Sequence, residues 1–221
     1  RDTDRSRGLG DVYKRQLFSP SLRMVVSVPS GSTEVEIRAV KDSSEHAGGR
    51  DVYMLYESMA AAIGIGIDVL APEGNMVVDI GGGTTEIAVI SLGGISSKQS
   101  IRVAGDEFTH DIMEYMRQKH NVRVGERTAE QIKIEVGSAL AELDNAPEDF
   151  VVTSADLMDS LPRQINVSYQ EIAQCLDKSI VKIESAILKT LESTPPELYS
   201  DVTQNLSLIH ISEPTRPISI S

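Results

Sequence analysis

The sequence has few of the side chains that crosslink a fold or bind a metal ion. Among its 221 residues there is one cysteine, Cys175, which excludes an internal disulfide bond and fits a reducing compartment. The four histidines, at positions 46, 110, 120 and 210, form no close metal-ligand pattern. The chain is still long enough to bury a hydrophobic core, as one large domain or two small ones.

Long apolar runs and positive charge are also scarce. No run approaches the roughly 20 apolar residues that cross a bilayer, and the N-terminus lacks the apolar segment of a secretion signal. Lys and Arg number 21 against 33 Asp and Glu, a formal net charge of -12 at pH 7. Because an acidic surface repels phosphate backbones, we expect no nucleic-acid partner. These features predict a soluble, cytoplasmic protein.

The two ends differ in composition from the rest of the chain. Residues 1–16 are basic with almost no apolar pattern, and residues 207–221 form a Ser/Ile/Pro string without helical or strand periodicity. Both resemble translated sequencing-adapter or vector sequence. We therefore expect 1–16 and 203–221 to be foreign tails, and the segment between them to be a fragment.

Strand-like and helix-like segments alternate in the first part of the remaining chain. Residues 24–31 predict a buried strand, and a helix follows from about Ser32 to Gly48, with Val35 on its packed face. Residues 51–56 predict a second strand, and residues 57–69 begin as a helix. This order is typical of a parallel sheet covered by helices.

Three neighbouring strands are predicted next, at residues 76–80, 87–92 and 98–105, which indicates an antiparallel or mixed sheet. A helix over about 107–120 follows.

The last part of the chain predicts two helices with two short strands between them at 150–168. The first helix, 128–140, begins with Thr128 and has Gln131 three residues later, a capping-box pattern, and its apolar stripe extends to Leu140. The longest helix, 171–192, has an apolar stripe at helical spacing, and Cys175 beside it is interpreted as packing. The stripe consists of Ile172, Leu176, Ile180, Ile183, Ile187 and Leu191.

Three consecutive glycines separate two apolar strands in VVDIGGGTTEIAVISLGG, residues 77–94. Glycines adopt positive φ readily and let backbone N–H groups converge into a phosphate cradle. Asp79 would then face a Mg²⁺ ion on that phosphate, and the Thr84 and Thr85 hydroxyls would orient water or contact phosphate. The alternative is a plain glycine turn that Asp79 caps. The string matches neither the P-loop nor the dinucleotide-binding fingerprint.

Five motifs follow one another along the chain: YESMAAAIG (56–64), NMVVDIGGGTTEIAVISLGG (75–94), IRVAGDEF (101–108), VGERTAEQIKIEVG (124–137) and TPPEL (194–198). In order and spacing they closely resemble the MreB/Mbl family of bacterial actin-like cell-shape proteins. The resemblance covers roughly residues 17–202. Several motifs in one order are more specific than any one of them.

This resemblance implies an incomplete α/β, actin-like ATPase fold of the ribonuclease H type, with mixed sheets flanked by helices. Residues 17–72 would be the remnant of the first domain. Residues 73–120 and 190–202 would form the core of the second domain with its phosphate hairpin, and 121–189 an inserted subdomain.

The resemblance also implies a function in cell shape. Such proteins bind ATP and Mg²⁺, assemble into homopolymer filaments at the inner membrane surface, and organise wall-synthesis membrane proteins, so a cytoplasmic, membrane-associated location is expected. The family hydrolyses ATP slowly on polymerisation. Its first phosphate hairpin and its C-terminal glycine motif are missing here, so we expect this chain to bind ATP poorly and to be inactive.

Residues of the phosphate end are assigned through the same resemblance. Asp79 would bind Mg²⁺ through water, and Glu57 would position the attacking water with help from Thr84. The phosphates would be held by Thr84 and three glycines, namely Gly81, Gly82 and Gly83. From the residues alone, Glu57 reads as an ordinary acid at a helix N-terminus that interacts with the helix dipole, and it is the motif match that favours the catalytic role. The family usually has Glu-Glu-Pro where this chain has Tyr56-Glu57-Ser58.

The ribose and adenine end is assigned to Glu130 and Lys133, with Gly105 allowing the backbone to approach the nucleotide. Glu130 and Lys133 stand three residues apart and so project from one side of a helix, where the alternative is a solvated charge pair. Two other functions stay open: another ATPase of the actin superfamily, such as an Hsp70-like chaperone or a sugar kinase, and a non-catalytic structural fragment.

Overall fold

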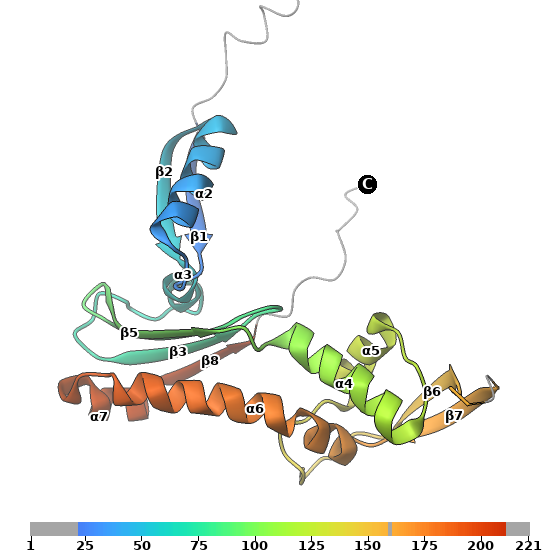
Figure 1. Ribbon diagram of the computed structural model, residues 1–221. Helices are drawn as coiled ribbons and strands as arrows, with labels where there is room; N and C mark the ends of the chain where they lie inside the picture. Colours follow the sequence, from blue (N-terminus) through green and yellow to red (C-terminus); the bar gives the residue numbers. More distant parts are fainter. Residues whose placement is uncertain (1–21, 159–160, 211–221) are drawn as a thin grey trace, which may run out of the picture.

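The computed structural model describes residues 22–158 and 161–210, which form three groups of elements (Figure 1). A small α/β unit stands upright above a four-stranded sheet, two helices lie along the opposite face of that sheet, and a unit of helices and a hairpin extends beyond it. Mixed sheets flanked by helices confirm the predicted α/β class. None of the helices in these ranges has the length and apolar character needed to span a membrane.

The upright unit is a β-α-β unit. Strands β1 (Leu22–Val28) and β2 (Gly49–Tyr56) pair in parallel, and α2 (Glu34–His46) connects them. A capping box starts the helix: the Thr33 hydroxyl accepts a hydrogen bond from the Glu36 N–H, and the Glu36 carboxylate accepts one from the Thr33 N–H. The predicted order of strand, helix and strand is confirmed.

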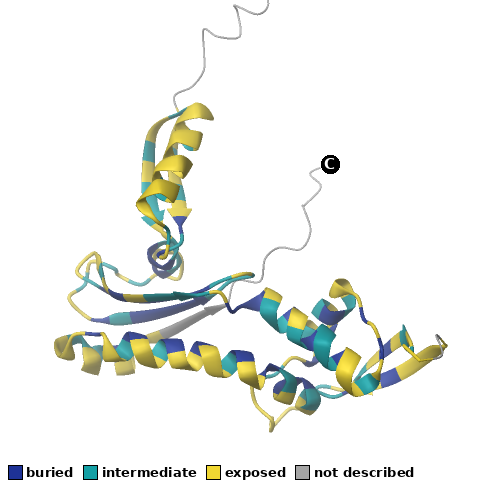
Figure 2. Ribbon diagram, viewed as in Figure 1, coloured by how far each residue is buried: buried dark blue, intermediate teal, exposed yellow. Residues whose placement is uncertain are grey.

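The upright unit buries less surface than the sequence predicts. The prediction of a buried first strand is wrong, because Val28 is the one buried residue of β1, and α2 buries none of its residues (Figure 2). Val35, expected on the packed face of the helix, is 78% exposed. Two strands and one helix form too small a unit to cover their own apolar side chains.

The central sheet has the order β5-β4-β3-β8 and is mixed, as predicted. Strands β3 (Asn75–Ile80), β4 (Thr85–Ser91) and β5 (Gly94–Ile101) form an antiparallel meander, whereas β8 (Leu206–His210) pairs with β3 in parallel. β5 begins four residues earlier than predicted. Its tight turn contains Leu92 and Gly93, both with positive φ, which matches the twist of a two-residue hairpin loop.

Both faces of this sheet are covered, which explains the continuous apolar runs in β3 and β4. Helices α6 (Tyr169–Glu192) and α7 (Pro196–Gln204) cover one face, and the short helix α3 (Glu57–Gly64) covers the other. Side chains alternate between two core clusters. The α6 face holds Met76, Val78, Ile87 and Val89, and the α3 face holds Val77, Ala88, Ile90, Met59 and Ala62.

The third group packs against the N-terminal half of α6. It contains α4 (Gly105–His120), α5 (Glu126–Val136) and an antiparallel hairpin of β6 (Phe150–Ala155) and β7 (Pro162–Val167). The predicted apolar stripe of α6 serves two cores: Ile172 and Leu176 lie in this one, and Ile187 and Leu191 pack under the central sheet.

The predicted capping box at Thr128 is wrong. α5 begins two residues earlier, at Glu126, with Gly125 as its N-cap and no side-chain cap. The helix also ends at Val136, so Leu140 lies beyond it and is 63% exposed. Because Thr128 is inside the first turn, its side chain cannot act as the cap residue.

Strand β8 contradicts part of the predicted C-terminal tail. We expect no strand period in 207–221, but residues 206–210 extend along β3. Without a neighbour, that edge of β3 would present unpaired N–H and C=O groups, which a short extended segment satisfies. The expected tail segments 1–16 and 211–221 lie outside the described residues, and the domain boundaries stay a prediction.

Candidate functional site

The glycine loop between β3 and β4 leaves several backbone donors free. The loop closes where the Gly81 N–H donates to the Thr84 carbonyl oxygen over 2.9 Å. Gly81 therefore has no amide left for a ligand, contrary to a role as phosphate donor. Within the described ranges, no hydrogen bond uses the N–H groups of Gly82, Gly83 or Thr84. Three successive amides thus remain to bind an anion.

The same loop is fixed against the start of α4. The Gly105 N–H donates to the Gly81 carbonyl oxygen over 3.1 Å, and the Asp106 N–H donates to the Gly82 carbonyl oxygen over 2.8 Å. These bonds satisfy two N–H groups that a helix N-terminus leaves free. A Cβ atom at position 105 would lie 3.4 Å from the Gly81 oxygen, which is an ordinary van der Waals contact, so this approach does not itself demand a glycine.

Two expectations about this loop are wrong. None of the loop glycines has positive φ; in the described residues the glycines that do are Gly48, Gly66 and Gly93. Four-residue hairpin loops are commonly built around a type I turn, which needs no left-handed residue at its centre. Thr85 is not available to a ligand, because it is fully buried and its hydroxyl donates to the Val103 carbonyl oxygen over 2.6 Å.

Two carboxylates face each other at the loop end of the hairpin. Asp79 on β3 pairs in register with Glu86 on β4, and the two side chains are 8% and 2% exposed. Burial, followed by the charge of Glu86, raises the pKa of Asp79. Asp79 Oδ1 is buried without a hydrogen-bond partner. No group of three or more His, Cys, Asp or Glu in the described residues could hold a metal ion by itself.

Glu57 lies on the helix that covers the sheet face to which these two carboxylates belong. It is the first residue of α3, the helix that covers this face of the sheet. Partial burial raises its pKa most, and the charges of Glu86 and Asp79 raise it further. A dipole interaction alone would favour the ionised form and lower the pKa, so burial and, after it, the neighbouring charges outweigh that interaction. A carboxylate with a raised pKa is a better proton acceptor near neutral pH.

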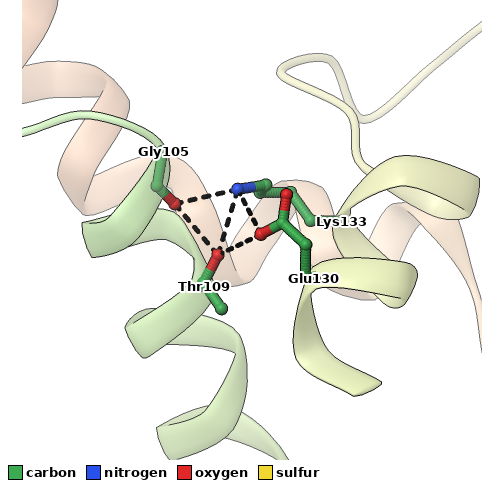
Figure 3. A network of polar contacts seen from close by, with 4 residues as sticks. All are labelled: Gly105, Thr109, Glu130 and Lys133. Carbon is green, nitrogen blue, oxygen red and sulfur yellow. Dashed lines mark hydrogen bonds and ion pairs between the residues drawn. The ribbon is translucent and has the colours of Figure 1, made fainter. Parts of the chain in front are cut away.

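Gly105, Glu130 and Lys133, predicted for the other end of the nucleotide, meet in one polar network (Figure 3). Lys133 Nζ lies 2.6 Å from Glu130 Oε2 and donates to the Gly105 carbonyl oxygen over 3.0 Å. It also lies 3.0 Å from Thr109 Oγ1, which lies 2.7 Å from Glu130 Oε2. The pair is therefore partly buried between α4 and α5, and Gly105 links it to the glycine loop.

Sequence reasoning missed Glu86 and Thr109. Glu86 is opposite Asp79 in the strand register, so counting outward from the glycine loop on both strands would have found it. Thr109 follows Gly105 by four residues, and its hydroxyl donates back to the Gly105 carbonyl oxygen over 3.0 Å. That spacing places both on one face of α4.

Sequence comparison identifies relatives over most of the chain. The family model described as MreB/Mbl protein matches residues 8–210. Cell shape-determining protein MreB of Escherichia coli (strain K12) is 42% identical over 193 residues, which cover 87% of this chain and 55% of that protein. Cell shape-determining protein Mbl of Bacillus subtilis (strain 168) is 44% identical over 186 residues, 84% of this chain and 55% of that protein. The chain thus spans about half the length of these relatives.

Structure comparison gives the same fold. The crystal structure of MreB5 of Spiroplasma citri bound to AMPPNP matches with a TM-score of 0.82 at 33% identity, over 91% of this chain and 61% of that one. A second structure of that protein is bound to ADP. The MamK double helical filament matches with a TM-score of 0.66 at 18% identity, over 90% and 59% of the two chains, which supports the actin-like fold alone.

Proposed function

The chain belongs to the MreB/Mbl family, and from that premise we propose that it carries one phosphate-binding half of an ATP-binding, filament-forming bacterial actin homologue. In the complete protein, homopolymer filaments would lie in the cytoplasm at the inner membrane surface and organise wall-synthesis proteins, which maintains rod shape. Family membership decides against the Hsp70-like chaperone and the sugar kinase.

One observation carries the nucleotide part of this proposal. The unbonded N–H groups of Gly82, Gly83 and Thr84 stand next to the end of the strand that holds Asp79, whose Oδ1 is buried without a hydrogen-bond partner. Successive amides suit phosphate oxygens, and a carboxylate beside them suits the accompanying cation. The nucleotides bound to the Spiroplasma citri relative support the same assignment.

Asp79 fits the Mg²⁺ ion that the family implies. An oxygen that is buried and without a partner is costly unless a donor or a cation joins it. Mg²⁺ usually keeps several waters and takes one or two carboxylates together with phosphate oxygens, so contact through a water suits Asp79. When bound, the ion would supply positive charge that offsets both the phosphates and the carboxylates.

The remaining residues take roles that their surroundings allow. Glu57, with its raised pKa, would accept a proton from the water that attacks the terminal phosphate, and the Thr84 hydroxyl would help orient that water. Glu130 and Lys133 would contact the ribose and adenine. The hydrogen bond from Lys133 to the Gly105 carbonyl oxygen would hold this end of the nucleotide site at a fixed position relative to the glycine loop.

The Mg²⁺ dependence of ATP binding tests this proposal. We expect the 221-residue chain to bind ATP weakly, because it spans about half the length of its MreB and Mbl relatives. Mg²⁺ should tighten binding by the wild-type chain but not by Asp79→Asn. Asp177→Asn, which changes an exposed carboxylate on α6, is the matched control and should behave as wild type.

Calorimetric titration with and without Mg²⁺ gives the answer. Micromolar ATP affinity of this chain would contradict its expected weakness, and an equal Mg²⁺ effect in wild type and Asp79→Asn would contradict the role of Asp79. In a complete version, Glu57→Ala should keep nucleotide and filaments but lose hydrolysis. Unchanged phosphate release would show that Glu57 has another role.

A further inference from the structure

Ser30, in the loop after β1, is bonded to the central sheet through all of its polar groups. Its N–H donates to Glu86 Oε2 over 3.2 Å, and its hydroxyl donates to the same oxygen. Its carbonyl oxygen accepts from Lys98 Nζ over 2.9 Å. Ser30 is buried, and its partners are 56 and 68 residues away in sequence. The end of β1 therefore cannot leave the sheet without breaking three hydrogen bonds.

Glu86 has the acceptor capacity that this arrangement needs. Its second oxygen, Oε1, accepts from the Ser100 hydroxyl over 2.6 Å, so three donors converge on one carboxylate. A carboxylate makes charge-assisted hydrogen bonds with these donors, whereas a glutamine would make weaker neutral ones and would turn its NH₂ group toward Ser30 or Ser100. The cluster of Ser30, Glu86, Lys98 and Ser100, named the latch here, is therefore expected to hold most firmly with a carboxylate at position 86.

The second strand of the upright unit is held at the same place. Tyr56 ends β2 opposite Val28 of β1, and Lys98 Nζ lies 4.6 Å from the centre of its ring, a cation–π contact. Tyr56 is also the residue immediately before Glu57. The latch thus contacts the chain at the C-terminal ends of both β1 and β2, next to Glu57.

Packing alone does not explain a charge at position 86. Glu86 stands opposite Asp79, and like charges in such a pair destabilise a sheet. Next to it on the same face, Ala88 and Ile90 pack against α3 as ordinary apolar residues. A buried carboxylate is explained if it connects the sheet to the upright unit, whose second strand leads directly into Glu57 at the start of α3.

We propose that Glu86 is a positioning residue: together with Ser30, Lys98 and Ser100 it fixes the upright unit on the phosphate-hairpin sheet and so sets where Glu57 stands relative to Asp79. The inference rests on the proposed function only for the role of Glu57. Loosening the latch would let the upright unit tilt away from the sheet.

Spin labels measure this directly in the full chain. Cysteines replace Arg38 on α2 and Ser185 on α6, both exposed, in a Cys175→Ser background. We expect one narrow distance distribution in wild type. Glu86→Gln should raise the ratio of displaced to docked populations by about tenfold, as expected when charge-assisted hydrogen bonds are replaced by neutral ones. Glu135→Gln, an exposed change on α5, is the control and should leave the distribution narrow.

A second readout tests whether the latch sets the position of Glu57 or only stabilises the fold. In Ser30→Ala, which keeps the Glu86 carboxyl, the carboxyl titration of Glu57, followed by NMR, should move toward lower pH, because a displaced Glu57 would leave the burial and the neighbouring charges that raise its pKa. A folded Glu86→Gln with the wild-type distance distribution would overturn the proposal. If that variant does not fold, Ser30→Ala decides: a broadened distribution supports the latch and an unchanged one refutes it. Neither readout needs nucleotide, so a chain that fails to bind ATP refutes the proposed function and leaves this test intact.

Discussion

Asp79 is expected to destabilise the ligand-free protein, so Asp79→Asn should make the chain more stable at neutral pH. The carboxylate is buried, has an oxygen without a partner and faces Glu86 across the hairpin. Like charges directly opposite each other on neighbouring strands cost up to about 1 kcal/mol. Removing one of them should raise the free energy of unfolding by about that amount, or the melting temperature by about 2–4 °C for a chain of this size.

The gain should depend on pH in a defined direction. The pKa of Asp79 is raised above its ordinary value of 3.8, so folding favours the neutral carboxyl. The wild-type protein therefore keeps its full stability below about pH 3.8 and loses part of it as the pH rises through the raised pKa. The advantage of Asp79→Asn should be complete at pH 7 and disappear as the pH falls toward 4.

Urea unfolding followed by circular dichroism at these two pH values measures the effect, with Asp177→Asn as the control for loss of an exposed charge. An Asp79→Asn chain that is less stable than wild type at pH 7 would refute the reasoning. An equal difference at both pH values would also refute it, because the effect would then not come from the charge. Stabilisation by loss of a site residue is a common trade-off between stability and activity.

Three further predictions concern the rest of the site and the core. Lys133→Met should lower the free energy of unfolding by about 2 kcal/mol, since it removes the ion pair with Glu130 and the hydrogen bonds to the Gly105 carbonyl oxygen and Thr109 Oγ1, and urea unfolding measures this. Gly105→Ala should change the free energy of unfolding by less than about 0.5 kcal/mol, because the new Cβ would lie 3.4 Å from both the Gly81 oxygen and Lys133 Nζ, an ordinary van der Waals distance; a loss of several kcal/mol in urea unfolding would contradict it. Burial raises the pKa of the Cys175 thiol to about 12, so a disulfide reagent at pH 8 should react only as the protein unfolds, and rapid labelling of folded chain would contradict that.

The local part of the site was predictable from the sequence. The glycine loop between two apolar strands predicts the hairpin and places Asp79 at its end, because strand period and turn composition are local properties. The helical spacing of Glu130 and Lys133 likewise predicts that they project together. The network confirms that spacing, and their contact with nucleotide stays a prediction.

The long-range part was not predictable. The partner of Glu86 is Ser30, 56 residues earlier, and no periodicity connects two positions so far apart. Burial of β1 and α2 was overestimated, since apolar spacing shows which face of an element is apolar and not whether anything covers it. Thr128 illustrates a boundary error, in which a valid capping sequence lies inside a helix that starts two residues earlier.

The central claim is that the amides at positions 82–84 bind the phosphates of a nucleotide. An NMR titration of the isotope-labelled 221-residue chain with ATP and Mg²⁺ tests it most directly, because backbone amide shifts report weak binding residue by residue. The account predicts the largest chemical-shift changes at the amides of Gly82, Gly83 and Thr84. When Mg²⁺ is present, these changes should be smaller in Asp79→Asn than in wild type. Shifts confined to other parts of the chain, or no shifts at saturating ATP, would contradict it.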